Sequence, residues 1–410
     1  MGQDSIVIRM YNVGFGDCFF VRINLGGISQ TMLVDCGSIK AGPRPIDEIV
    51  KDVIDDAKDK DGTPRIDVVV ATHRHKDHVS GFASPLWKSV VVQEVWMPWT
   101  EDPDDPQAQK IRNTQSNLAA ALAANSETKV RAWARSQPGT ENLQLTAVSD
   151  LAANALSNEA AMKTLHEGFA GKPQRRFFPT KNAKDAIFET SALAHVLVHI
   201  FGPSRDENVI RDMDPPAAQS YLRLYEENTP ASEIPDPFRE DWWLDDDRSS
   251  LLSSADRTRI TEIGSDLDFN LAVALDKAVN GTSLMLMFKI CEEWLLFPGD
   301  AQWGTWQAAL GNPEWKPLLE KTTFYKIGHH GSHNATPVEF VSQTVGNGFT
   351  AMASTHHVDQ WPSIPKEELL SALAEKTNKI ARSDRESEAP TGIFRVVPDR
   401  YIETEIPLTL

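Results

Sequence analysis

Short apolar runs separated by polar turns recur along the amino-terminal third of the chain. These runs are rich in β-branched and aromatic side chains, which predicts strands. The predicted strands cover residues 6–13, 18–23, 31–38 and 66–73. Gly26 and Gly27 predict a tight turn between the second and third of them. The run over residues 66–73 is almost continuously apolar, as expected of a strand buried on both faces.

Helical periodicity appears between and after the predicted strands. Over residues 45–58, Ile46, Ile49 and Val50 fall on one face and acidic residues on the other. A second helix is predicted over residues 366–380. Further predicted strands cover residues 192–204, 282–290, 293–300, 322–332, 348–355, 392–397 and 401–406. Mixed strands and helices predict an α/β fold.

Two segments interrupt this pattern. Residues 101–190 are rich in Ala, Asn, Gln and Ser with helix-like stretches, and they predict a helical insertion. Residues 205–266 are polar, acidic and contain several prolines, which disfavours a dense core and predicts a long excursion with some helix. We therefore expect residues 1–410 to form one domain that carries two insertions.

Composition narrows the class of protein. The net charge of −17 argues against broad, non-specific binding along nucleic acid, because phosphate contacts need clustered Lys and Arg. No apolar run approaches the roughly 18 residues that a membrane span requires. The amino terminus lacks the features of a signal peptide, so we expect a cytoplasmic protein without a membrane partner. The three cysteines are widely spaced and predict no disulfide framework.

The segment T-H-R-H-K-D-H places three histidines and one aspartate within residues 73–78. Because it directly follows a predicted strand, a turn there can aim His73 and His75 at one point and Asp77 and His78 at a second. Imidazole and carboxylate are suitable zinc ligands, and two neighbouring ions can clamp a hydrolytic transition state. The spacing therefore predicts a site for two divalent ions.

Three later motifs extend this pattern in chain order: L-V-D-C-G with Asp35, L-L-F-P-G-D with Asp300, and Y-K-I-G-H-H-G-S with His329 and His330. Taken together, the motifs resemble those of metallo-β-lactamase-fold hydrolases. The resemblance implies a four-layer αββα sandwich with the metal site at one edge of the sheets. It also implies that Asp35 supports the site and that Asp300 bridges both metals.

The resemblance implies a ligand set for one or two divalent ions, most simply Zn²⁺ with Mn²⁺ as an alternative. The implied ligands are His73, His75, Asp77, His78, Asp300 and His329. For the last ligand of the second metal we prefer His329 to His330, because His329 is the first to emerge from the strand.

Within this superfamily the chain most resembles the hydrolase domain of the DNA-uptake competence protein ComEC and its soluble relatives. The resemblance rests on the G-F-G-D turn within residues 12–21, the N-G-T-S segment with Asn280 and Ser283, and K-I-G-H-H-G-S with Lys326. It implies cleavage of a phosphodiester, in nucleic acid or a small molecule, by a metal-activated water. The candidate catalytic residues are Asp77, His330, Lys326 and Asp35, with His330 or Lys326 protonating the leaving group or contacting an anionic oxygen.

The chain departs from the family where most members supply another histidine to the first metal. His166, His195 and His199 lie in that interval, but none has the usual Gly-containing context. His195 and His199 fit core positions better, so one-metal operation stays open. In the G-F-G-D turn, Gly14 and Gly16 permit close backbone approach, and Asp17 is either a partner of a histidine ligand or substrate, or part of a purely structural turn.

Two other functions use the same sequence features. A hydrolase of small esters or thioesters would use the same ligands with a more apolar pocket. A catalytically silent scaffold would bind a protein partner through the insertions.

Overall fold

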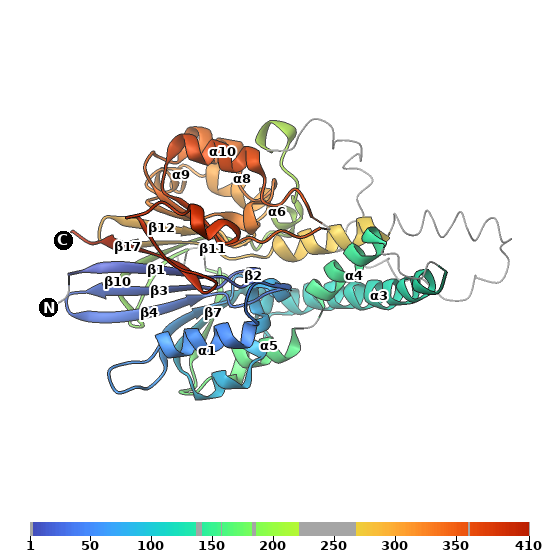
Figure 1. The fold of residues 1–410 in the computed structure, drawn as a ribbon, viewed down its shortest axis with the longest axis horizontal. Helices are drawn as coiled ribbons and strands as arrows, with labels where there is room; N and C mark the ends of the chain where they lie inside the picture. Colours follow the sequence, from blue (N-terminus) through green and yellow to red (C-terminus); the bar gives the residue numbers. More distant parts are fainter. Residues whose placement is uncertain are drawn as a thin grey trace.

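The computed structural model describes residues 3–136, 142–156, 158–182, 186–220, 268–359 and 361–409. Two large mixed sheets pack face to face (Figure 1). The first sheet contains, in spatial order, β16 (Phe394–Val397), β17 (Tyr401–Pro407), β1 (Ser5–Tyr11), β3 (Phe19–Leu25), β4 (Ile28–Val34), β6 (Arg65–Val70), β7 (Val91–Pro98) and β8 (Gln174–Phe178). The second contains β15 (Ile380–Arg382), β14 (Thr350–Ala353), β13 (Phe324–Lys326), β12 (Glu293–Phe297), β11 (Met285–Ile290), β10 (Leu193–Gly202) and β9 (Ile187–Thr190). A small ribbon pairs β2 (Gly14–Phe15) with β5 (Lys40–Ala41).

Each large sheet is antiparallel on one side and parallel on the other. In the first sheet, β4, β6, β7 and β8 run parallel to one another. In the second sheet, β12, β13, β14 and β15 do the same. The carboxyl ends of parallel strands meet at one edge of a sheet, so the loops that follow these strands gather at one end of the sandwich.

The inner faces of the two sheets share one apolar core, in which Ile8 and Val21 of the first sheet join Leu286 and Phe288 of the second. The outer face of the first sheet is covered by α1 (Ile46–Asp56). The outer face of the second is covered by α8 (Trp303–Gly311), α9 (Lys316–Leu319) and α10 (Glu367–Lys376). The order of layers is thus helix, sheet, sheet, helix, which confirms the predicted α/β sandwich.

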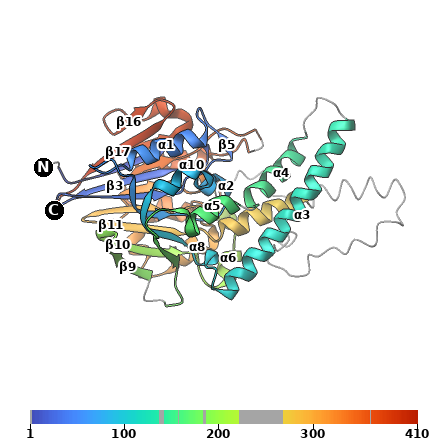
Figure 2. The ribbon, with the colours of Figure 1, turned by 90° about the horizontal axis from the view of Figure 1, so that it is seen from below.

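The helical insertion is shorter than predicted. Its helices are α3 (Pro106–Ser136), α4 (Leu143–Ala155), α5 (Glu159–Lys163) and a π-helical turn (Thr164–Gly168). α3, α4 and a helix whose described residues are 268–280 project from the sandwich and share an apolar cluster (Figure 2). α5 and the π-helical turn instead pack with α1 on the outer face of the first sheet. The predicted range 101–190 is wrong at its end, because β8 and β9 complete the edges of the two sheets.

Of the predicted acidic insertion over residues 205–266, the structure describes only the beginning, with α6 (Glu207–Arg211) and a short 3₁₀ helix (Ala217–Gln219). Residues 221–267 lie outside the described part of the chain. The helix predicted over residues 366–380 ends earlier, at Lys376, because Thr377 adopts an extended conformation and Ile380 pairs with Ala351 of β14.

The structure bears on the cysteines and on the length and apolar character of the helices. Cys18, Cys36 and Cys291 are all free thiols. Among the described helices, none combines the length and the apolar character needed to cross a bilayer.

Glu94 on β7 forms a buried polar link between the two sheets. Its carboxylate accepts hydrogen bonds from Thr190 Oγ1 at the edge of the second sheet (2.6 Å) and from Trp96 Nε1 (2.8 Å). The guanidinium of Arg176 donates two more, at 2.7 and 2.9 Å. Burial raises the pKa of Glu94, but these donors outweigh it and lower the pKa below its ordinary value.

We predict that Glu94→Gln destabilises the protein by about 1–3 kcal/mol at pH 7, because the amide cannot accept from all of these donors. A carboxyl with a lowered folded-state pKa stabilises the fold above its unfolded-state pKa of 4.5, and that contribution disappears as the pH falls through the folded-state value. Urea denaturation of the wild type and Glu94→Gln should therefore show a difference in the free energy of unfolding that is larger at pH 7 than in acid below pH 4.5. An equal difference at pH 7 and in acid would contradict a charged carboxylate at Glu94.

Candidate metal centre

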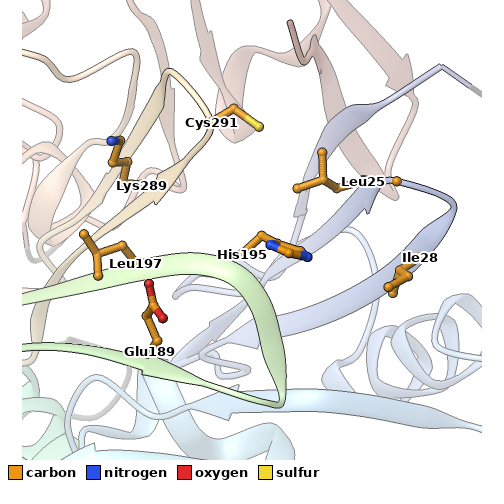
Figure 3. Close-up of a pocket in the computed structure, with 8 residues that line it drawn as sticks. Leu25, Ile28, Glu189, His195, Leu197, Lys289 and Cys291 are labelled. Atoms are coloured by element: carbon orange, nitrogen blue, oxygen red, sulfur yellow. The ribbon is translucent and has the colours of Figure 1, made fainter. Parts of the chain in front are cut away.

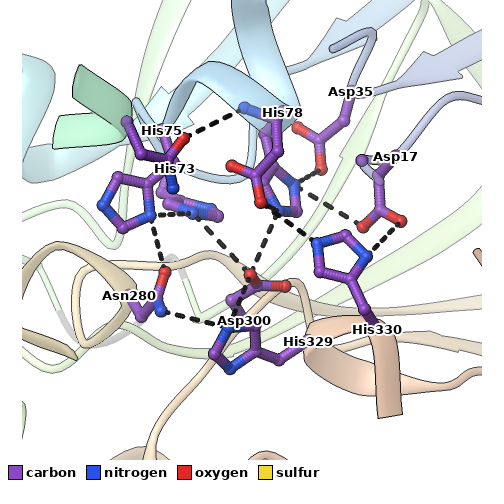
Figure 4. A network of polar contacts seen from close by, with 12 residues as sticks. Asp17, Asp35, His73, His75, His78, Asn280, Asp300, His329 and His330 are labelled. Atoms are coloured by element: carbon purple, nitrogen blue, oxygen red, sulfur yellow. Dashed lines mark hydrogen bonds and ion pairs between the residues drawn. The ribbon is translucent and has the colours of Figure 1, made fainter. Parts of the chain in front are cut away.

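The predicted site residues come together at the end of the sandwich where the parallel strands finish (Figure 4). His73 and His75 lie in the loop after β6, and the short helix α2 (Lys76–Val79) carries Asp77 and His78. Asp300 follows β12, and the turn Gly328–Gly331 after β13 carries His329 and His330. Asp35 follows β4. Residues that are distant in sequence thus converge because their strands end at one edge.

One compact group consists of Asp77, His78, Asp300 and His330, which are all buried and whose ligand atoms lie within 4.8 Å of one another. Nε2 of His78 lies 3.1 Å from Oδ2 of Asp300 and 3.8 Å from Oδ2 of Asp77. Nε2 of His330 lies 3.1 Å from Oδ2 of Asp77. We call this group the second position.

In the structure His330, rather than the preferred His329, groups with Asp77, His78 and Asp300 at the second position. Nδ1 of His330 donates to the carbonyl of Ser354 at 2.8 Å, which turns Nε2 toward Asp77. His329 points to the other side of Asp300, with its Nε2 3.8 Å from Oδ2 of that residue. Both histidines have a left-handed backbone, with φ of 42° and 53°, so two successive side chains diverge within one turn.

His73 and His75 form a second grouping with Asp77, which we call the first position. Nε2 of His73 lies 3.1 Å from Nδ1 of His75 and 4.0 Å from Oδ2 of Asp300. Asp300 therefore lies between the two positions, as expected of a bridging carboxylate. Asp77 contributes to both groups.

Asp35 contacts the site through a histidine. Its carboxylate accepts from the backbone N–H of Thr72 (2.7 Å), from Thr72 Oγ1 (2.7 Å) and from Nδ1 of His78 (2.9 Å). The contact with Nδ1 fixes the tautomer of His78 and leaves Nε2 directed at Asp300 and Asp77. Asp35 is thus a positioning residue, as the sequence indicates.

Lys326 is a buried cation on the inner side of the site. It forms an ion pair with Asp17 and lies 3.7 Å from Oδ1 of Asp300. Burial lowers the pKa of Lys326, but the carboxylates of Asp17 and Asp300 outweigh it and raise the pKa above its usual value. Lys326 is held by carboxylates and His330 faces Asp77, so the role of either side chain toward a leaving group or an anionic oxygen stays a prediction.

Asp17 also ties the G-F-G-D turn to the metal-ligand helix. Its backbone N–H donates to the carbonyl of Asp77 at 2.9 Å, and its carbonyl accepts from Gly37 at 2.9 Å. A Cβ atom at Gly37 would lie 2.6 Å from backbone atoms of Asp77 and His78. The sequence predicts close backbone approach at Gly14 and Gly16. The structure shows that Gly37 is also at a close approach, to the backbone of the helix that carries the ligands.

The imidazoles divide into two electrostatic classes. Burial lowers the pKa of His73 well below its usual value and that of His75 to about 4, so both are neutral at pH 7. Burial also disfavours charge on His78, but Asp300 and Asp77 outweigh it and raise the pKa of His78 well above the usual value. In return, the neighbouring imidazoles outweigh burial and lower the pKa of Asp77 and Asp300.

The donor set fits divalent cations. Four buried carboxylates, Asp17, Asp35, Asp77 and Asp300, face a single buried lysine, so without a metal ion their charge is offset only by that lysine and by protonated imidazoles such as His78. Within the described part of the chain, Oδ1 of Asp77 and Oδ1 of Asp300 are buried and have no hydrogen-bond partner. The combination of imidazole nitrogen and carboxylate oxygen is typical of Zn²⁺ sites and is compatible with Mn²⁺.

Helices of the insertions bring further residues to the site, of which sequence reasoning missed Asp276 and Asn154 and named Asn280 without giving it a contact. Asp276 lies on the helix over residues 268–280, with Oδ1 3.7 Å from Nε2 of His75. Asn280 follows one turn later, and its Oδ1 lies 2.8 Å from Nδ1 of His75. Asn154 of α4 accepts from the backbone N–H of Asp77 at 3.3 Å. The i,i+4 spacing of Asp276 and Asn280 is the signal that would have placed both on one helix face.

The three histidines considered for the first metal lie elsewhere. His166 is stacked on Phe177, and His199 is buried beside Trp294. His195 is exposed rather than in the core, because its φ of 65° breaks the regular strand there.

His195 lines a cavity of about 530 Å³ at the far end of the sandwich (Figure 3). The lining also includes Leu25 and Ile28, from the turn that joins β3 and β4, and Cys291. That turn is at the opposite end of β4 from Asp35. The cavity is therefore separate from the metal centre.

Compared with known proteins, the chain matches no family model and no curated protein.

Proposed function

We propose that this chain is a metal-dependent hydrolase of the metallo-β-lactamase type that cleaves phosphodiesters. The observation that carries the proposal is the buried group of Asp77, His78, Asp300 and His330, four ligand-bearing side chains from three separate loops within 4.8 Å. A purely structural core would not concentrate so many carboxylates and imidazoles in one place.

The arrangement of the fold supports the metallo-β-lactamase type. The proposed ligands follow strands in both sheets, β6 in the first and β12 and β13 in the second, and they meet at one edge of a helix–sheet–sheet–helix sandwich. That is the placement which the resemblance of the motifs implies. The insertion helices contact this edge through Asn154 and Asn280, where they are placed to select a substrate.

The residues of the chain have distinct roles in this proposal. Asp77, His78, Asp300 and His330 would hold one ion, and His73 and His75 would contribute to another, with Zn²⁺ or Mn²⁺ as the metal. Such ions lower the pKa of water and offset charge that develops on substrate oxygens. Asp35 holds His78, Ser354 holds His330, and Lys326 together with Asp17 holds Asp300.

A phosphodiester is the substrate class that the ComEC-like motifs favour. The protein's charge of −17 and the carboxylates of the site repel a phosphate, so its binding must depend on the bound ions. Activity should therefore vanish on chelation and return on re-addition of metal.

The test compares hydrolysis of bis(p-nitrophenyl) phosphate and p-nitrophenyl acetate by metal-loaded protein, chelated protein and His78→Ala. We expect metal-dependent turnover of the phosphodiester that exceeds turnover of the ester, and loss of roughly 10³-fold in His78→Ala. His357→Ala is the matched control, because the side chain of His357 is 67% exposed and lies 3.2 Å from the exposed Asp359, away from the proposed ligands. Metal-dependent turnover of the ester alone would show that the protein is an esterase rather than a phosphodiesterase. If the metal-bound protein hydrolyses neither substrate, the proposal that it is a hydrolase is contradicted.

A further inference from the structure

The first position has two imidazoles, His73 and His75, but lacks the third histidine that most relatives of this type supply. We propose that His329 and Asn280 take its place, and that the chain therefore holds two ions. This inference rests on the proposed metal-dependent function and goes beyond it. It assigns to the ion at the first position two ligands that the sequence motifs do not give to that ion.

The side chains around the first position form a closed ring (Figure 4). Going round it, Nε2 of His73 lies 3.1 Å from Nδ1 of His75, which lies 2.8 Å from Oδ1 of Asn280. Nδ2 of the same amide lies 3.5 Å from Nε2 of His329. Nε2 of His329 lies 3.8 Å from Oδ2 of Asp300, which lies 4.0 Å from Nε2 of His73.

The spacing of this ring matches a coordination shell. Ligand bonds of about 2.0–2.2 Å around a five-coordinate ion place neighbouring ligand atoms roughly 2.8–3.8 Å apart. The contacts in the ring, from 2.8 to 4.0 Å, cover that range. His73, His75 and His329 thus supply three imidazole nitrogens, Asp300 supplies the shared carboxylate, and Asn280 supplies a neutral oxygen.

Asp276 fixes the orientation of the Asn280 side-chain amide. Nδ2 of Asn280 donates to Oδ2 of Asp276 at 3.2 Å, so the amide oxygen is directed to His75. Oδ1 of Asp276 lies 3.7 Å from Nε2 of His75, the nitrogen that points away from the ring. A carboxylate behind a ligand histidine is a common way to orient it. Asp276 is therefore a positioning residue for both His75 and Asn280.

The turn after β13 explains how one dipeptide serves both positions. His329 and His330 have φ of 42° and 53°, a conformation that is unfavourable for non-glycine residues and is concentrated at functional sites. With this backbone, His330 faces Asp77 while His329 faces Asn280. The two imidazoles reach opposite sides of Asp300, one for each position.

The test counts metal ions. Each protein is loaded with Zn²⁺, passed through gel filtration and analysed by inductively coupled plasma mass spectrometry. We expect about two ions per chain in the wild type and His357→Ala, and about one in His329→Ala. Asn280→Asp keeps an oxygen donor and should retain about two. In Mn²⁺-loaded samples, electron paramagnetic resonance should show a coupled pair in the wild type and an isolated ion in His329→Ala.

Circular dichroism and the melting temperature show whether His329→Ala has folded. If it has not, His329→Gln replaces it with the same expected loss of one ion. Two ions in the folded variant would overturn the inference. One ion in both the variant and the wild type would also overturn it, but that result is still compatible with a metal-dependent hydrolase. A wild type that takes up no ion would overturn both.

Discussion

Asp300→Asn is expected to reduce turnover of bis(p-nitrophenyl) phosphate by roughly 10³-fold or more. Oδ2 of Asp300 lies 3.1 Å from His78, 3.8 Å from His329 and 4.0 Å from His73, so one carboxylate serves both positions. The amide has nearly the same shape but lacks the charge that bridges two cations. Steady-state kinetics of Zn²⁺-loaded protein measure the loss, and metal analysis should show that fewer ions are retained.

Asp359→Asn is the matched control for this experiment. The side chain of Asp359 is 83% exposed, and the substitution removes the same charge from the surface. Its turnover should equal that of the wild type. Turnover of Asp300→Asn within a few-fold of the wild type would show that Asp300 does not bridge the ions.

Gly37→Ala is expected to disrupt the site without altering any proposed ligand. The added Cβ would lie 2.6 Å from backbone atoms of Asp77 and His78, and backbone cannot move aside as a flexible side chain can. We expect a loss of about 1–3 kcal/mol or more in the free energy of unfolding, together with reduced metal content, because the helix that carries two ligands must shift.

Urea denaturation and metal analysis of Gly37→Ala provide the measurement. Gly311→Ala is the control, since a Cβ atom there meets nothing within 4 Å. Its stability and metal content should stay close to those of the wild type. If Gly37→Ala also keeps wild-type stability and metal content, the close packing of the turn against α2 does not hold the ligands in place.

Much of the sandwich is predictable because its strands are apolar, short and bounded by turn residues. The predicted strand over residues 66–73 and the helix over residues 45–58 correspond to β6 and α1. The sheet edges are not predictable in the same way. β8, with the sequence Q-R-R-F-F, carries charged residues and follows a helical stretch, and its pairing with β7 is a tertiary contact that no local pattern reveals.

The site residues likewise fall into those that local sequence predicts and those that depend on tertiary structure. Asp77, His78 and Asp300 follow apolar strands in recognisable motifs, and their convergence follows from where the strands end. The choice between His329 and His330 depends on two left-handed backbone conformations and on a hydrogen bond to Ser354, none of which the order of residues reveals. Asp276 was missed because it lies on a helix next to the acidic segment, where no motif marks it.

The central claim is that Asp77, His78, Asp300 and His330 hold a divalent ion. Anomalous X-ray scattering from crystals of Zn²⁺-loaded protein, collected on both sides of the zinc edge, tests it most directly. We expect a zinc peak about 2.0–2.2 Å from Nε2 of His78, from Nε2 of His330 and from oxygens of Asp77 and Asp300. A map with no peak among these four side chains, or with zinc bound only elsewhere on the protein, would contradict it.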